Sequence, residues 1–305
     1  MIKRRTTSIL IILILFVTGL FNGCDNEPKQ NADEEYIKLI NEWDNKRIEN
    51  LKSKTGWLNL AGLYWLKEGE NKFGGNNEND IVFPDGKADD FIGSFILNNG
   101  QVTLKVNPGV KVYSNNELVT DLIVMPDTSE NTTIMDHNNL SWFVIIRDDK
   151  VGIRLRDYDS ETVKTFNGID RFPVDTTWRI KAKYIKFETT KIITVPNILG
   201  TFSEEESKGE IVFTKNGTTY SLAPIAAGDK YFIIFADETS GIYTYGAGRF
   251  LYSNIEDENG NIILDFNKAY NPPCAFSKYA TCPIPPKENH LKLSVTAGEK
   301  NWGNH

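Results

Sequence analysis

The chain has 305 residues, of which 40% are hydrophobic, and its formal net charge is −7 at pH 7. This length allows one large or two modest globular domains with a sizeable core, and the composition excludes a disordered chain. Because an acidic surface repels phosphate backbones, nucleic acid is not expected as a partner.

The N-terminus carries the pattern of a secretory signal. Lys3, Arg4 and Arg5 precede an apolar run over residues 9–17, which is too short to span a bilayer comfortably. Gly23 then stands directly before Cys24, an order that resembles the bacterial lipoprotein lipobox. We expect residues 1–23 to be a signal peptide, Cys24 to carry a lipid, and residues 24–35 to be a solvated tether. The alternatives are an ordinary signal peptide or a membrane anchor with an incidental cysteine.

Export has two further consequences. Removal of residues 1–23 takes away three positive charges and no negative ones, so the net charge goes from −7 to −10. If Cys24 is lipidated, the remaining thiols are Cys274 and Cys282. In an oxidising compartment, two thiols this close are expected to form a disulfide, here closing a small proline-rich loop.

One long helix is expected, over residues 36–56. Mostly apolar and aromatic side chains recur there at three- and four-residue spacing, which indicates a face packed on the main body; the residues on this face are Tyr36, Leu39, Ile40, Trp43, Arg47 and Leu51. Gly56 can end the helix in the left-handed conformation.

From Trp57 onward the sequence predicts short strands separated by turn residues, as in sandwiches and barrels. The expected strands are 58–66, 71–73, 80–83, 91–97, 102–106, 111–113, 142–147, 151–156, 178–184, 211–214, 218–222, 231–235, 243–245, 250–254, 262–266 and 291–295. Asn216-Gly217 is the strongest hairpin signal. The absence of strand–helix alternation argues against a parallel α/β sheet. The predicted class is therefore all-β and mainly antiparallel, with one N-terminal helix.

The order of segments between Leu63 and Val119 loosely resembles forkhead-associated (FHA) β-sandwich domains: GENKFGG, NDIVFPDG, a hydrophobic strand, NNGQVTL and YSNNELV. This resemblance implies a sandwich over residues 57–158, followed by a second β-rich region over 159–305. FHA domains hold phosphothreonine with an Arg and a Ser-x-x-His pair. Here Gly75 stands where the Arg is expected, which implies that phosphopeptide binding is lost.

Residues 237–290 contain the one candidate site. Asp237 and Asp265 each end an apolar strand, where side chains reach the mouth of a sheet. Two such carboxylates can act as an acid and base pair, with Arg249 binding an anionic or carbonyl group. The further ligand-binding candidates are Tyr245, Asn267, Tyr270, Asn271 and His290. In the structural alternative Arg249 pairs with Asp237 or Asp265, because buried charges are usually paired. No metal site and no cofactor are expected.

The segments GWLNLAGLYWLKEGENKFG, FNGIDRFPVDTTWRIKAKY, TYGAGRFLY and DFNKAYNPPCAFSKYATCPIPPKENHLKLSVTAGEK resemble the bacterial domain-of-unknown-function family DUF1684. The resemblance extends from about Tyr36 to Lys300, and it implies no established activity.

The leading functional hypothesis is a lipid-anchored binding module of the cell envelope, periplasmic or on the surface side, for a small polar or carbohydrate-like ligand or a partner protein. Clustered polar and aromatic groups without a recognisable nucleophile favour it. One alternative is a glycoside-type hydrolase using Asp237 and Asp265, which requires the two carboxyls to face each other across an open cleft. The other is a purely structural envelope protein.

Overall fold

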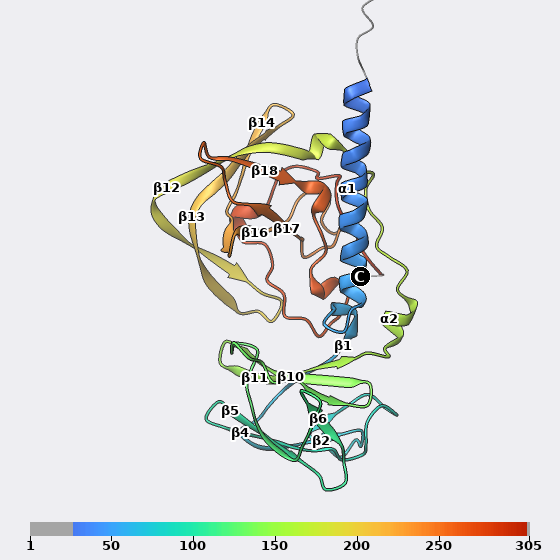
Figure 1. Cartoon of the computed structure of the whole chain (residues 1–305). Helices are drawn as coiled ribbons and strands as arrows, with labels where there is room; N and C mark the ends of the chain where they lie inside the picture. The colour runs from blue at the N-terminus through green and yellow to red at the C-terminus, as the bar shows by residue number, and fades with distance from the viewer. Residues whose placement is uncertain (1–26, 304–305) are drawn as a thin grey trace, which may run out of the picture.

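The computed structural model describes residues 27–303, with side chains from Asp33 onward. The predicted signal peptide and Cys24 lie outside the described residues. Figure 1 shows a β-sandwich built from the first half of the chain, a second β-rich body built from the second half, and a long helix that runs along one side of this second body towards the sandwich.

Helix α1 spans Glu27–Lys52, so it begins inside the segment expected to be a tether. Ile40 and Leu51 are buried, as the helical spacing predicts, and Leu51 packs with Ala275 and Phe276 of the C-terminal body. Leu39, expected on the same face, is 53% exposed. It lies at the edge of the stripe, where a rotation of one residue, about 100°, is enough to turn a side chain to solvent.

The turn after α1 requires Gly56 for a different reason from the one predicted. Gly56 has a φ of −67°, so the left-handed cap expected there is wrong. A Cβ at this position would lie 2.1 Å from the Leu51 carbonyl oxygen. The glycine is therefore needed because the backbone folds back closely onto the last helical turn.

The sandwich contains two sheets. The first has the order β1-β11-β10-β9-β6-β7, with β1 (Leu60–Trp65), β6 (Val112–Ser114), β7 (Glu117–Val119), β9 (Met135–His137), β10 (Leu140–Arg147) and β11 (Lys150–Asp157). The second has the order β3-β2-β4-β5-β8, with β2 (Gly69–Gly74), β3 (Ile81–Val82), β4 (Gly93–Asn98), β5 (Gln101–Val106) and β8 (Asp121–Val124). Every pair is antiparallel except β2 with β3.

The sandwich core follows from strand alternation. Trp142 of β10 and Ile153 and Leu155 of β11 point into one cluster with Phe73 and Phe95 of the opposite sheet. The Phe73 and Trp142 rings meet edge to face at 5.6 Å. Since successive side chains alternate across a strand, the residues between these core positions must lie on the outer face.

The C-terminal body also contains two sheets. One has the order β14-β13-β12-β18 and the other β15-β16-β17; the strands are β12 (Arg179–Pro196), β13 (Phe202–Lys215), β14 (Thr218–Leu222), β15 (Ile225–Ala227), β16 (Lys230–Phe235), β17 (Arg249–Asn254) and β18 (Asn261–Asp265). Ile180, Leu264 and Ile233 are buried together between them. Asn216 and Gly217 both have positive φ, so the predicted tight hairpin is confirmed.

The remaining elements are short. Helix α2 (Glu161–Thr165) is capped by the Ser160 hydroxyl, which accepts a hydrogen bond from the Val163 N–H. The 3₁₀ turns are η1 (Trp57–Asn59), η2 (Thr176–Trp178), η3 (Phe266–Lys268), η4 (Pro273–Ala275) and η5 (Lys287–Asn289). No helix within residues 27–303 is long and apolar enough to cross a membrane.

Two expected strands are absent from the described chain, over 243–245 and 291–295. Residues 242–244 donate their N–H groups to the Thr239 carbonyl in a turn. In the second segment, the N–H and C=O of Val295 bind the side chains of Asp237 and Arg249 in place of a neighbouring strand. Sheets that are almost wholly antiparallel, together with one long N-terminal helix, nevertheless confirm the predicted class.

Candidate functional site

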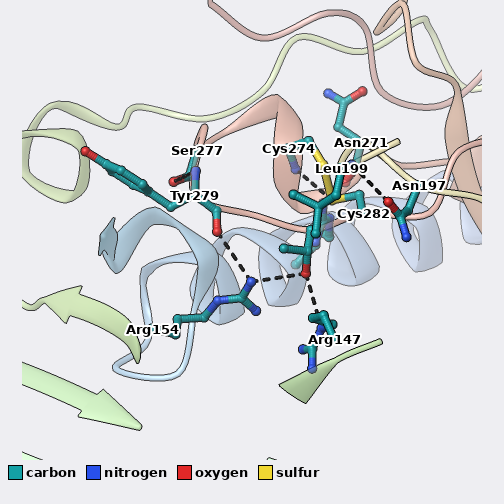
Figure 2. Close-up of a disulfide and its surroundings, with 11 residues drawn as sticks. Arg147, Arg154, Asn197, Leu199, Asn271, Cys274, Ser277, Tyr279 and Cys282 are labelled. Carbon is teal, nitrogen blue, oxygen red and sulfur yellow. Dashed lines mark hydrogen bonds between the residues drawn. A yellow bond between two sulfur atoms is a disulfide. The ribbon is translucent and has the colours of Figure 1, made fainter. Parts of the chain in front are cut away.

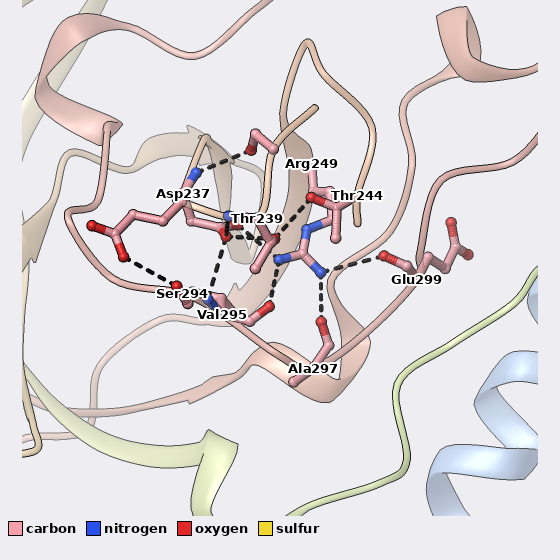
Figure 3. A network of polar contacts seen from close by, with 10 residues as sticks. Asp237, Thr239, Thr244, Arg249, Ser294, Val295, Ala297 and Glu299 are labelled. Atoms are coloured by element: carbon pink, nitrogen blue, oxygen red, sulfur yellow. Dashed lines mark hydrogen bonds and ion pairs between the residues drawn. The ribbon is translucent and has the colours of Figure 1, made fainter. Parts of the chain in front are cut away.

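Arg249 opens β17 and is completely buried. Its Nη2 donates to Asp237 Oδ2 at 2.8 Å and to the Val295 carbonyl at 3.0 Å. Its Nη1 donates to the carbonyls of Ala297 and Glu299, at 2.5 and 3.3 Å. Figure 3 shows the guanidinium enclosed by these acceptors. Burial lowers the pKa of Arg249, while the Asp237 carboxylate opposes that change. The guanidinium therefore holds the final segment of the chain.

The Asp237 carboxylate is also buried, and both of its oxygens have hydrogen-bond partners within the protein. Its side chain has no exposed area, and Oδ1 accepts hydrogen bonds from the Thr239 N–H at 2.8 Å and hydroxyl at 2.6 Å, and from the Val295 N–H at 3.3 Å. Thr239 in turn contacts the Thr244 hydroxyl at 2.9 Å. A carboxylate with both oxygens occupied inside the protein cannot exchange protons with a bound substrate. The alternative in which Asp237 pairs with Arg249 is the one observed.

Asp265 belongs to a separate network. Its Oδ1 accepts from the Tyr36 hydroxyl at 2.5 Å and from Asn267 Nδ2 at 3.4 Å. Burial, followed by the Asp265 carboxylate, raises the pKa of Tyr36, so this tyrosine remains the donor. Asp237 and Asp265 thus do not face each other across an open cleft, and the prediction of a catalytic carboxylate pair is wrong.

Asn267 and Asn271 fix the C-terminal segment to its surroundings. Asn267 Nδ2 donates to the Asp175 carbonyl at 2.9 Å, and its Oδ1 accepts from the Asp175 N–H at 3.0 Å. The backbone N–H of Asn271 donates to Glu299 at 2.6 Å, and its side chain donates to the Lys300 carbonyl at 2.8 Å. Both side chains are buried, so neither is placed to bind a ligand.

Glu299 was not singled out from the sequence, yet it joins helix α1 to the end of the chain. It is fully buried, and it accepts from Arg47 Nε at 2.9 Å. Arg47 also donates to the Asn271 carbonyl at 2.9 Å. Nothing in the local sequence distinguishes Glu299 from an exposed glutamate, because its partner lies 252 residues away.

The other predicted ligand-binding residues separate from one another. His290 is exposed, and its Nε2 lies 3.4 Å from the Pro285 carbonyl. Tyr245 packs against two apolar clusters, and burial raises its pKa. Tyr270 is half-buried and lines two cavities. Of the predicted set, Tyr270 lines two cavities that could hold a ligand.

The predicted bridge between Cys274 and Cys282 is confirmed. The loop that it closes points at the outer face of β10 and β11 (Figure 2). The Thr281 hydroxyl accepts from Arg154 Nη2 at 3.1 Å and from Arg147 Nε at 3.3 Å. Arg154 Nη2 also lies 3.4 Å from the Tyr279 carbonyl. The disulfide loop therefore meets two arginines of the sandwich.

A cavity of about 340 Å³ lies at this junction; we call it the arginine cleft. Its sandwich side is formed by Phe143, Arg147, Arg154 and Arg156, which are outward-facing residues of β10 and β11. Its C-terminal side is aromatic and apolar, and Cys282 contributes to it. Its other lining residues are Trp57, Leu60, Phe232, Phe250, Tyr252, Tyr270, Pro273, Ala280, Thr281 and Pro283. No carboxylate is among these lining residues.

Arg147, Arg154 and Arg156 differ in whether a carboxylate lies within ion-pair distance. Arg147 forms an ion pair with Asp127 at 2.7 Å. Arg154 has no carboxylate within ion-pair distance in residues 33–303, and its Nε is buried without an acceptor there. Burial, and then the charge of Arg147, lower the pKa of Arg154 to about 10.

Arg156 is the least satisfied of the three. Its Nε is buried without an acceptor, and among the described residues its guanidinium has no hydrogen-bond or ion-pair partner. It lies 5.0 Å from the centre of the Phe143 ring, and burial lowers its pKa. Since buried polar groups are nearly always paired, the buried Nε–H of Arg156 is a candidate donor to a bound acceptor.

One sequence pattern relates to the arginine cleft, but it is weak evidence by itself. In VGIRLRD, Ile153 and Leu155 alternate with Arg154 and Arg156, which predicts a strand with one apolar and one basic face. Such a face is usually open to solvent. Only the approach of the disulfide loop converts it into the wall of a cavity.

A second cavity of about 460 Å³ lies beside α1 and β17; we call it the lysine pocket. It is lined by Trp43, Lys46, Arg47, Asn50, Trp57, Lys230, Tyr252, Ser253, Asn254, Lys268 and Tyr270. It too has no carboxylate in its lining, and it shares Trp57, Tyr252 and Tyr270 with the arginine cleft. In the described part of the chain, no group of His, Cys, Asp and Glu side chains could hold a metal ion.

Comparison with known proteins gives one domain match over part of the chain and no activity. The solution NMR structure of an uncharacterized protein from Haloarcula marismortui is 28% identical over 46% of this chain and 80% of that one, with a TM-score of 0.38. The crystal structure of the FhaA FHA domain, complexed with the intracellular domain of a second protein, is 14% identical over 31% of this chain and 97% of that one, with a TM-score of 0.22. No curated protein matches the chain. Residues 164–300 match the model described as "Protein of unknown function (DUF1684)". This stretch is shorter than the resemblance predicted. The second β-rich body of this chain therefore contains a DUF1684 domain.

Proposed function

We propose that this protein is a binding module of the cell envelope that holds a small anionic ligand in the arginine cleft. The observation that carries the proposal is the pair Arg154 and Arg156, whose partly buried guanidinium groups face one cavity without a carboxylate partner among the described residues. A guanidinium binds carboxylate and phosphate in bidentate geometry, so these are the ligand groups that fit.

The partly buried arginines of the cleft carry an electrostatic cost. A cation that is removed from water without a counter-ion or an acceptor loses hydration free energy that nothing in the protein returns. Arg154, Arg156 and Arg147 also raise the electrostatic potential of one another, as the lowered pKa of Arg154 shows. An anion bound between them would relieve both costs. Hydrogen bonds to charged groups contribute about 1.5–3 kcal/mol each, which is enough for micromolar binding when a few are formed.

The opposite wall restricts the ligand further. The same cleft is lined by Phe232, Phe250, Tyr252 and Tyr270, which come from the C-terminal body. The Phe232 and Phe250 rings meet edge to face at 4.9 Å, which makes this wall rigid and apolar. The ligand would therefore carry an apolar or aromatic body as well as an anionic group. A volume near 340 Å³ suits a molecule at the small end of the range that protein pockets accept.

The location is proposed from the N-terminal sequence. A basic start, a short apolar run and Cys24 support export and lipid attachment, and the Cys274–Cys282 bridge fits an oxidising compartment. Mass spectrometry of the mature protein from membranes would detect a lipid-modified Cys24 as its first residue. An unmodified cysteine, or a mature chain that starts elsewhere, would contradict lipid anchoring.

The binding proposal can be tested with one anion and its neutral analogue. Isothermal titration calorimetry would compare biphenyl carboxylate, which has a single para carboxylate, with the corresponding carboxamide. We expect the carboxylate to bind and the carboxamide to bind weakly or not at all. Arg156→Met should weaken carboxylate binding by about 10- to 100-fold, the equivalent of one charge-assisted hydrogen bond. Arg156→Lys should recover only part of the loss, because lysine keeps the charge without the planar fork.

The control is Arg179→Met, which removes an exposed arginine outside the cleft. The affinity of this control variant for biphenyl carboxylate should equal that of the wild type. Because the Arg156 guanidinium has no acceptor in the described structure, Arg156→Met should leave the melting temperature unchanged or raise it. The proposal is overturned if the wild type binds carboxylate and carboxamide equally, or if Arg156→Met binds the carboxylate as the wild type does.

A further inference from the structure

The lysine pocket has the same character as the arginine cleft, although other elements build it. Lys46 comes from α1, Lys230 from β16 and Lys268 from η3, so three segments far apart in the sequence contribute lysines to the lining of one cavity. Lys46 and Lys230 have no ion-pair partner among the described residues, and Lys268 lies 3.9 Å from Asp265. Three ammonium groups around one hollow repel each other and attract an anion.

The two cavities adjoin at an aromatic boundary. Trp57, Tyr252 and Tyr270 line both. The Tyr252 and Tyr270 rings stack with centres 6.4 Å apart and planes at 12°. Arg47 lies over the Tyr270 ring at 4.5 Å, and its bonds to Glu299 and Asn271 fix it there. The boundary is therefore built from rings held in place by their neighbours, with a cationic hollow on each side.

From this arrangement we infer that the arginine cleft and the lysine pocket form one elongated site. Its ligand is a dianion that carries an acidic group at each end and an aromatic or apolar segment between them. One end binds Arg154 and Arg156, the middle lies on Tyr252 and Tyr270, and the other end binds Lys46 and Lys230. This inference rests on the proposed function for the arginine end, and it adds the second acidic group and the length of the ligand.

The lining of the two cavities differs in charge from the chain as a whole. The protein is acidic, with a net charge of −7, yet two adjacent cavities contain cations and no lining carboxylate. A ligand with one charge would use only one of them. A ligand with two charges gains the second set of contacts without a second loss of translational freedom, which is the usual advantage of linked binding groups.

The test compares rigid ligands that differ by one carboxylate. Biphenyl and terphenyl acids with one para carboxylate would be titrated beside those with a carboxylate at each end, using calorimetry with the full mature chain. For at least one of the two lengths, the dicarboxylate should bind about tenfold or more tightly than the monocarboxylate, as a new charge-assisted contact predicts. In the double variant Lys46→Gln and Lys230→Gln this advantage should disappear, while the affinity for the monocarboxylate stays unchanged. Both lysines are exposed, so the variant is expected to fold.

The outcomes separate the two proposals. If the monocarboxylate binds in an Arg156-dependent manner but the second carboxylate adds no affinity at either length, the elongated site is wrong and the anion-binding function stands. If the dicarboxylate keeps its advantage in the lysine variant, the lysine pocket is not the second subsite. If neither acid depends on Arg156, the proposed function itself fails.

Discussion

Replacing Asp237 with asparagine tests whether the former catalytic candidate is a structural residue. The amide can still accept from the Thr239 N–H and hydroxyl and from the Val295 N–H, so the shape of the turn is retained. What is lost is the charge that faces Arg249 at 2.8 Å, where both side chains have no exposed area. The variant therefore isolates the electrostatic part of the network.

The magnitude follows from this burial. Removing one partner of a buried ion pair costs about 3–5 kcal/mol, because the remaining charge is left without compensation. For a chain of this size, 1 kcal/mol corresponds to about 2–4 °C, so Asp237→Asn should lower the melting temperature by roughly 10 °C. The guanidinium would keep its three carbonyl acceptors at Val295, Ala297 and Glu299, which explains why the protein should still fold.

Denaturant unfolding followed by circular dichroism would measure the change. Glu238→Gln is the matched control, because Glu238 is the exposed neighbour and contacts the same terminal segment through Ser294 at 3.0 Å. The control should change stability by less than about 0.5 kcal/mol. A loss below about 1 kcal/mol for Asp237→Asn would refute the buried pair and return Asp237 to the list of site candidates.

Two further predictions concern the Cys274–Cys282 disulfide and the titration of Tyr64. Replacing Cys274 and Cys282 with serine, which opens a loop with a sequence separation of 8, should cost about 2–3 kcal/mol in denaturant unfolding; equal stability under oxidising conditions would contradict this. Burial, followed by the charge of Tyr279, raises the pKa of Tyr64 from 10.0 to about 12. The contribution of the protonated Tyr64 side chain to the free energy of unfolding is thus complete below pH 10, and it is lost as the pH rises to about 12. Tyrosinate absorbance should show Tyr64→Phe losing a late-titrating group; unchanged titration would refute the shift.

Local sequence determined much of the architecture. Local patterns predicted the strands of the β10–β11 hairpin, Asn216-Gly217 predicted a tight turn, and two nearby cysteines predicted a bridge. Each of these depends on a few neighbouring residues, whose steric and solvation preferences act over short distances. The helix was predicted for the same reason, although its beginning at Glu27 was not.

The site was decided by contacts between distant residues. Whether Asp237 faces solvent or Arg249 depends on how residues 295–299 return to β17, and no periodicity carries that information. Arg154 and Arg156 appear in the sequence as an ordinary basic strand face, and they became the wall of a cleft only when the Cys274–Cys282 loop packed opposite them. Alternation in a strand determines which side chains share a face, whereas the free energy of a charge depends on what the folded chain places in front of it.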